Sequence, residues 1–298
     1  MPATRGVKGV SVDVGIAIFL TDDGPDPVAF AQAAEAYGFH SIFLPEHSHF
    51  PVARKTPYPD VYGGGDLPWY YKHTLDQIVT LSMIASQTSE LKVGTGITLL
   101  AQHDPIWKAK ELATLDLLSD GRLLCGLGYG WNVDEAEAHG VTWRSRFSVV
   151  RDKVAVMRAL WTEEQAAYDG THVSLAASWA WPKPRQVGGP PIYLGGAGPT
   201  TMREAADWAD GWYVVPPKDD MRLEQVMPRF RQVVEERGRD PESISVAVAG
   251  APRNPRLLEA YAEQGFKLTT LWVDPAHSHE QGMKNLEAAA KTLTDYLG

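Results

Sequence analysis

Residues 91–128 read LKVGTGITLLAQHDPIWKAKELATLDLLSDGRLLCGLG, and this stretch decides the fold class. It opens with an apolar strand pattern and closes with another. Between them, Asp104 and Pro105 are typical of a helix N-cap and first helical residue, and Gly121 is typical of a helix stop. A strand, a helix and a second strand in this order predict a parallel βαβ unit.

The same alternation continues on both sides of this unit. Asp26 with Pro27, and later Pro199, mark further helix starts. Further strand patterns are GVSVDVGIAIFL, HSIFL, PPIYLGG, GWYVV, SISVAVAG and FKLTTLWV. About eight strand–helix units in 298 residues predict a single (β/α)8 TIM-barrel domain over residues 1–298. An open doubly wound sheet fits this count less well.

Two connections are longer than barrel loops usually are. One follows the second strand, from Pro45 to about His73, and the other follows the fourth helix, from about Glu163 to Pro191. The second connection is expected to be irregular. Long ordered loops of this kind are typical of lids and binding loops.

Composition excludes several classes of protein. The net charge of −9 makes nucleic acid a poor partner, and no apolar run approaches the ~20 residues of a membrane span. The single cysteine, Cys125, cannot form an internal disulfide, and no leader pattern is visible, so a cytoplasmic protein is expected. Cys125 lies in an apolar strand and is predicted to be a buried structural thiol.

Candidate catalytic residues follow the second strand. Glu46, His47 and His49 there are consistent with a polar loop, a metal site, or contacts to substrate and cofactor. A metal-dependent barrel hydrolase would also draw histidines from later strands, yet none occurs between His172 and His277. The metal site is therefore disfavoured.

Glycine clusters mark three strand ends. Gly94 and Gly96 in the third strand predict a bulge or the close approach of a flat ligand. The segment YLGGAGPTT (193–201) places a glycine-rich turn before a helix start, which favours an anion site. CGLGYGWN (125–132) lacks the spacing of the dinucleotide fingerprint.

Five segments, taken in order, carry a family resemblance. They are AAEAYGFHSIFLPEH, the stretch from Leu91 to Val141, MRALWTE, YDGTHVSL, and PKPRQVGGPPIYLGGAGPTTMREAADWADGW. Together they resemble the bacterial luciferase-like monooxygenase superfamily, in particular its branch that depends on the deazaflavin coenzyme F420.

The resemblance implies a TIM barrel that binds F420, or FMN as the alternative, at its C-terminal mouth, and that forms a homodimer. It also implies a non-proline cis peptide at Gly96-Ile97, and a cofactor phosphate held by Gly128, Gly130, Gly195, Gly196 and Ala197. The cofactor site that it implies consists of Gly96, Ile97, Thr98, Gly128, Tyr129, Gly130, Trp131, Gly195, Gly196 and Ala197.

Two departures qualify the resemblance. Deazaflavin relatives commonly carry Asp-His where this chain has Glu46-His47, and sugar-phosphate dehydrogenase relatives carry a glutamate where it has Trp131. The second difference disfavours a sugar-phosphate substrate.

The expected reaction is hydride transfer between F420 and a small organic substrate. His47 is the expected proton donor or acceptor, because histidine ordinarily titrates near neutral pH, and Glu46, His49 and His103 are the second candidates. The residues expected around the substrate and its lid are His49, Trp69, Tyr70 and His103, and Trp131 is expected to close the pocket together with Trp69 and Tyr70. The alternatives are an FMN-dependent monooxygenase, a metal-dependent hydrolase, and a cofactor carrier without turnover.

Overall fold

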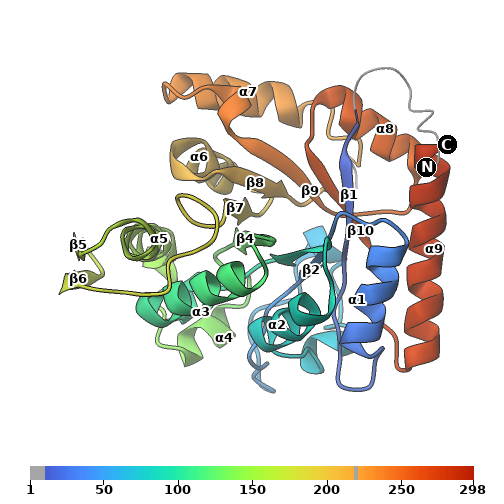
Figure 1. Ribbon diagram of the computed structural model, residues 1–298, viewed down its shortest axis with the longest axis horizontal. Helices are drawn as coiled ribbons and strands as arrows, with labels where there is room; N and C mark the ends of the chain where they lie inside the picture. Colours follow the sequence, from blue (N-terminus) through green and yellow to red (C-terminus); the bar gives the residue numbers. More distant parts are fainter. Residues whose placement is uncertain (1–10, 218–220) are drawn as a thin grey trace.

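The computed structural model describes residues 11–217 and 221–298. Its centre is a closed barrel of eight parallel strands, in the spatial order β1-β10-β9-β8-β7-β4-β3-β2, which confirms the predicted TIM barrel (Figure 1). The barrel strands are β1 (Asp13–Ala17), β2 (Ser41–Leu44), β3 (Lys92–Thr95), β4 (Leu123–Leu127), β7 (Ile192–Gly195), β8 (Gly211–Val214), β9 (Ser245–Ala251) and β10 (Leu268–Trp272).

Helices follow the strands and cover the outside of the barrel. They are α1 (Pro27–Ala36), α2 (Gln77–Gln87), α3 (Pro105–Leu118), α4 (Val133–Ala138), α5 (Arg146–Thr162), α6 (Pro199–Trp208), α7 (Val226–Glu236), α8 (Pro255–Gln264) and α9 (His279–Leu297). The predicted starts are confirmed. Asp26 Oδ1 accepts a hydrogen bond from Ala29 N at 2.8 Å, and Asp104 Oδ1 accepts from the backbone at the start of α3.

Apolar side chains fill both the shell between strands and helices and the inside of the barrel. Inside the barrel, Phe43, Leu124, Tyr193, Tyr213, Ala247 and Leu268 form a buried cluster. The rings of Phe43 in β2 and Tyr213 in β8 lie 5.0 Å apart, although these strands are on opposite sides of the barrel. Side chains therefore fill the inside of the barrel below its mouth, and a ligand can bind only at the carboxyl ends of the strands.

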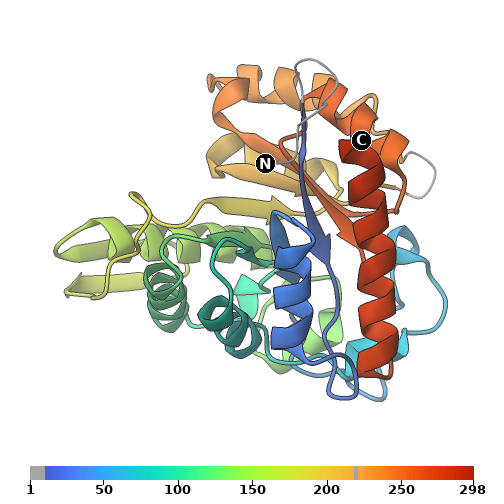
Figure 2. The same cartoon turned by 45° about the vertical axis from the view of Figure 1, so that its right-hand side comes forward.

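The two long connections differ in structure. Between β2 and α2 the chain forms only two 3-10 turns, η1 (Asp60–Tyr62) and η2 (Trp69–Lys72). After α5, the expectation of an irregular stretch is wrong for its first half, because β5 (Ala166–Asp169) and β6 (Ser174–Ser178) form an antiparallel hairpin that projects beyond α5 (Figures 1 and 2). The strands of this hairpin are short and half exposed, so its apolar pattern is weak. Residues 179–191 contain no helix or strand, as expected.

The long helix α5 is the fourth barrel helix, and the short α4 is an addition in the loop after β4. In the part of the chain that the structure describes, we find no helix with the length and hydropathy needed to cross a bilayer.

Candidate active site

A cavity of about 540 Å³ opens at the carboxyl ends of the barrel strands. Every barrel strand, or the loop that follows it, contributes to its wall. The lining residues include Ala17, Phe19, Glu46, His47, Gly96, Ile97, Tyr129, Trp131, Gly195, Gly196, Tyr213, Val215, Gly250 and Trp272. Its volume and its position are those of a small-molecule site in a TIM barrel.

The end of β3 forms one wall of the cavity. The peptide bond between Gly96 and Ile97 is cis, as the resemblance implies, and Ile97 faces the cavity. A Cβ atom on Gly128 would lie 1.8 Å from Ile97 Cδ1, and one on Gly195 would lie 2.5 Å from Ile97 Cγ2. A Cβ atom on Gly126 would lie 2.0 Å from the carbonyl oxygen of Thr95. These glycines therefore make room for the chain after β3.

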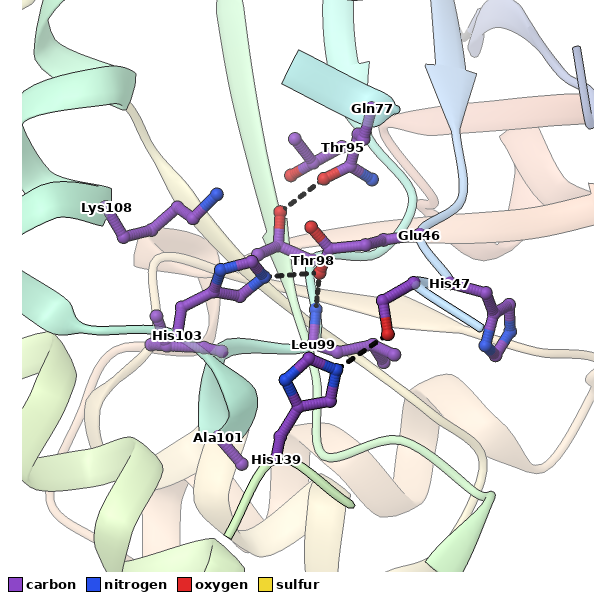
Figure 3. Close-up of polar contacts among 12 residues, drawn as sticks. Glu46, His47, Gln77, Thr95, Thr98, Leu99, Ala101, His103, Lys108 and His139 are labelled. Carbon is purple, nitrogen blue, oxygen red and sulfur yellow. Dashed lines mark hydrogen bonds and ion pairs between the residues drawn. The ribbon is translucent and has the colours of Figure 1, made fainter. Parts of the chain in front are cut away.

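The cavity wall contains some, but not all, of the residues that the resemblance assigns to the cofactor. Gly130, with φ 73°, and Gly196 line the cavity, whereas Gly128, Thr98 and Ala197 are not among its lining residues. Thr98 is fully buried, and its hydroxyl donates to Gln77 Oε1 at 2.6 Å (Figure 3).

Glu46 is held in place by the loop after β3. Its Oε2 accepts a hydrogen bond from Leu99 N at 2.6 Å and lies 2.9 Å from His103 Nε2 (Figure 3). Burial alone would raise the pKa of Glu46, but the hydrogen bond with His103 and the nearby charge of Lys108 lower it below its ordinary value. The contacts with Leu99 and His103 are both made by Oε2 of Glu46, a residue that lines the cavity, whereas His103 contacts this carboxylate rather than lining the cavity.

His47 is paired with an acid that the sequence analysis missed. His47 Nδ1 lies 2.8 Å from Glu135 Oε2, and the two side chains are 6% and 1% exposed. Ser48 N donates to the other oxygen of Glu135 at 3.0 Å. Because an ionised carboxylate only accepts, Nδ1 carries the hydrogen, and Nε2 of His47 is left for a ligand. Glu135 lies in α4 beside other acids, and no sequence signal distinguishes it from them.

Aromatic side chains form the wall around His47. Phe19, Tyr58 and Tyr71 are buried together, and they pack against Phe50, Leu67, Tyr70, Trp131 and Trp272. The loop after β2 supplies most of this aromatic wall. The next acid in α4, Asp134, fixes that loop, because its carboxylate accepts from Thr56 Oγ1 at 2.6 Å and from Thr56 N at 2.9 Å. These hydrogen bonds lower the pKa of Asp134 to about 2.

The expected lid residues divide between the cavity and its surroundings. Tyr70 and Trp131 line it. Trp69 does not, because its ring stacks on His277 with the centroids 3.5 Å apart. His49 is exposed and contacts Ser48 Oγ at 2.9 Å.

The cavity is also lined by an arginine, Arg146, that the sequence analysis missed. Arg146 is the first residue of α5, and its Nε is buried without a hydrogen-bond partner among the described residues. The hydroxyl of Tyr129 is likewise buried and unpartnered, and Thr201, in the first turn of α6, lines the same cavity. A cation at a helix N-terminus is electrostatically unfavourable unless an anion binds beside it. The arginine at the start of α5 was therefore the sequence signal that could have indicated an anion site.

Cys125 and the metal alternative fall outside this site. Cys125 is fully buried, and burial raises the pKa of its thiol to about 12, which confirms a structural thiol. Among the residues that the structure describes, the group that could converge on a metal is Asp22, Asp23 and His73, all exposed, and it includes neither His47 nor His49.

Comparisons with known proteins agree with the fold. The model of the luciferase-like monooxygenase family matches residues 17–296. An uncharacterized protein of Mycobacterium tuberculosis is 39% identical over 94% of this chain and 98% of its own length. The F420-dependent glucose-6-phosphate dehydrogenase of Kineococcus radiotolerans is 30% identical over 72% of this chain and 60% of its own.

A solved structure gives the same picture of the fold. The F420-dependent tetrahydromethanopterin reductase of Methanopyrus kandleri superposes with a TM-score of 0.73, over 97% of this chain and 100% of that one. At 17% sequence identity this likeness concerns the fold alone.

Proposed function

Because the chain belongs to the luciferase-like monooxygenase family, we propose that it is an F420-dependent oxidoreductase that transfers hydride between the coenzyme and a small organic substrate. The name of the Kineococcus relative, at 30% identity, supports the cofactor. The observation that carries the proposal is that one cavity is lined both by Arg146, a cation that can bind an anion, and by His47, a buried group that can transfer a proton.

The residues present fit a phosphorylated cofactor. Arg146, Tyr129 and Thr201 line the cavity, where a guanidinium and two hydroxyl groups can donate to a phosphate, and the start of α6 adds backbone N–H groups beside Thr201. Ile97 and the glycines around it would face the flat ring.

Bound F420 would supply a carbon that accepts or donates hydride. His47 would take the proton from a substrate hydroxyl as the alcohol is oxidised, or return it to a carbonyl oxygen in the reverse direction. Glu135 would hold the imidazole with Nε2 toward the substrate, and Glu46 would stay ionised beneath it. The aromatic wall would exclude water.

Titration of the apoprotein with F420, and separately with FMN, tests the cofactor through fluorescence quenching. We expect tighter binding of F420. Binding of neither would refute a flavin-type cofactor, whereas preferential binding of FMN with oxygen consumption would identify a monooxygenase. Tight F420 binding with no redox change across a broad panel of alcohols and ketones would identify a carrier.

The resemblance also implies a homodimer, and one face of the barrel supports it. Residues 77–88, which include α2, contain no charged side chain, and Val79 and Met83 on this helix are 62% and 50% exposed. Ile106 and Trp107 on the adjacent α3 are 46% and 70% exposed. Because the chain carries a net charge of −9, an uncharged apolar face is where two copies would repel each other least. Light scattering should show a dimer that Trp107→Glu converts to a monomer.

A further inference from the structure

His47 separates the reaction cavity from the outer surface of the molecule. It lines the large cavity and also a second, smaller hollow formed with Ser48, His49, Phe50, Tyr71, Lys72 and Thr74. Its own side chain is only 6% exposed. A proton taken up by His47 therefore needs a route to water that does not pass back through the occupied cavity.

A row of titratable and hydroxyl groups connects His47 to the surface. His47 Nδ1 contacts Glu135 Oε2 at 2.8 Å, and Ser48 Oγ lies 3.4 Å from Glu135 Oε1. The same Ser48 oxygen lies 2.6 Å from Nε2 of His139 and 2.9 Å from Nδ1 of His49. Figure 3 shows His139 reaching this position from below the chain segment that carries His47.

The burial of these groups changes abruptly along the row. Glu135 is 1% exposed, whereas Ser48, His49 and His139 are exposed. A hydroxyl has one proton and two lone pairs, so Ser48 can accept from one neighbour while it donates to another. Histidine is the side chain that exchanges protons with water most readily near neutral pH. The row thus has the composition of a proton relay with a buried start and a solvent-exposed end.

We propose that Glu135, Ser48 and His139 conduct the substrate proton between His47 and water, with His49 as a parallel exit. The inference rests on the proposed function. In alcohol oxidation, the C–H bond breaks and its hydride goes to F420, while the O–H proton goes to Nε2 of His47. The Nδ1 proton passes to Oε2 of Glu135, and rotation of the protonated carboxyl group presents it to the hydroxyl oxygen of Ser48, whose own proton goes to Nε2 of His139; His139 then releases one proton to water. This leaves His47 neutral with its hydrogen on Nε2, and a flip of the imidazole ring returns a hydrogen to the Nδ1 position before the next turnover. Ser48 and His139 act through His47 and touch no substrate.

A single-turnover experiment separates hydride transfer from proton release. The loss of F420 absorbance reports the hydride step, and a pH indicator in weak buffer reports the proton. In the unaltered protein the two signals should coincide. In Ser48→Ala, proton release should lag hydride transfer by ~10-fold or more, as expected for the loss of a proton-transfer group. Ser48→Thr, which keeps the hydroxyl, should restore coincidence. The double variant His49→Ala/His139→Ala should also show a lag, and added imidazole should shorten it.

Ser148→Ala is the matched control. Ser148 Oγ lies 2.8 Å from His172 Nε2 in an exposed pair that has no link to Glu135, so its removal should leave both signals unchanged. Coincident signals in Ser48→Ala and in the double variant of His49 and His139 would overturn the relay. An absence of hydride transfer in every protein, including the unaltered one, would instead refute the proposed function.

A second measurement needs neither cofactor nor turnover. The Nδ1 proton of His47, hydrogen-bonded to a buried carboxylate, should give a resolved low-field NMR signal in the apoprotein. We expect Ser48→Ala to slow its exchange with water, whereas a merely structural role for Ser48 would leave the exchange unchanged or accelerate it through loosening. Unchanged or faster exchange in Ser48→Ala would overturn the relay.

Discussion

Replacement of Glu135 by glutamine tests how strictly the site depends on one form of His47. The carboxylate accepts from two donors, His47 Nδ1 at 2.8 Å and Ser48 N at 3.0 Å. A glutamine amide offers one oxygen and one NH2 group, so it can accept from only one of them. If the oxygen keeps the bond to Ser48 N, the NH2 group faces Nδ1 and favours the imidazole with its hydrogen on Nε2. That form cannot accept a substrate proton.

We expect Glu135→Gln to lower kcat ~10²–10⁴-fold, the range associated with loss of a general base or of its orienting acid. The affinity for F420 should change little, because Arg146 and Tyr129 line the cavity whereas Glu135 does not. Because Ser48 N and Nδ1 both keep a partner in this arrangement but the acceptor is no longer charged, the free energy of unfolding should fall by only ~1 kcal/mol, the difference between a charged and a neutral hydrogen bond. Steady-state kinetics, F420 titration and urea unfolding measure the three quantities.

Glu137→Gln is the control for this prediction, since Glu137 lies in the same helix but is exposed. It should leave all three quantities unchanged. A kcat for Glu135→Gln within ~3-fold of the unaltered enzyme would refute the orienting role of Glu135 and, with it, His47 as the acid–base group.

Three further changes test other parts of the site. Arg146→Ala should weaken F420 binding by ~10–100-fold, with Arg146→Lys intermediate, because a charged hydrogen bond to phosphate is lost; an unchanged dissociation constant in fluorescence titration would remove Arg146 from the site. For Glu46→Gln, the stability difference from the unaltered protein should be full above pH ~4.5 and shrink as the pH falls, because the native environment lowers the pKa of Glu46; a difference in urea unfolding that is constant from pH 7 to 3.5 would contradict this. Gly126→Ala should destabilise by ~1–3 kcal/mol, because its Cβ would lie 2.0 Å from the carbonyl oxygen of Thr95, whereas Gly198→Ala, whose Cβ meets nothing within 4 Å, should cost less in a thermal melt.

The general architecture could be predicted from the sequence because its signals are local. Asp-Pro pairs cap helices through contacts within three residues, as Asp26 and Asp104 do. Apolar runs such as LLCGL in β4 are buried on both faces, as expected for a parallel barrel. The β5–β6 hairpin was missed because its strands are too short and too exposed to show a clear period.

The site was predicted only in part. Glu46 and His47 could be found because polar residues directly after a barrel strand must lie at the mouth. Their partners could not: His103 is 57 residues from Glu46, and Glu135 is 88 residues from His47. The position of Trp69 could not be predicted either, because its ring stacks on His277, which is far away along the sequence.

The sequence by itself therefore determined the order of the barrel strands and of the helices between them, the closed barrel, and the strand ends where chemistry is expected. Only the tertiary structure decided which acid pairs with His47, that Arg146 and Tyr129 line the same cavity, and that the glycines of CGLGYGWN accommodate Ile97 and the carbonyl oxygen of Thr95. The physical reason is that periodicity and capping act over a few residues. Hydrogen bonds and close packing instead join atoms that come together only when the barrel closes.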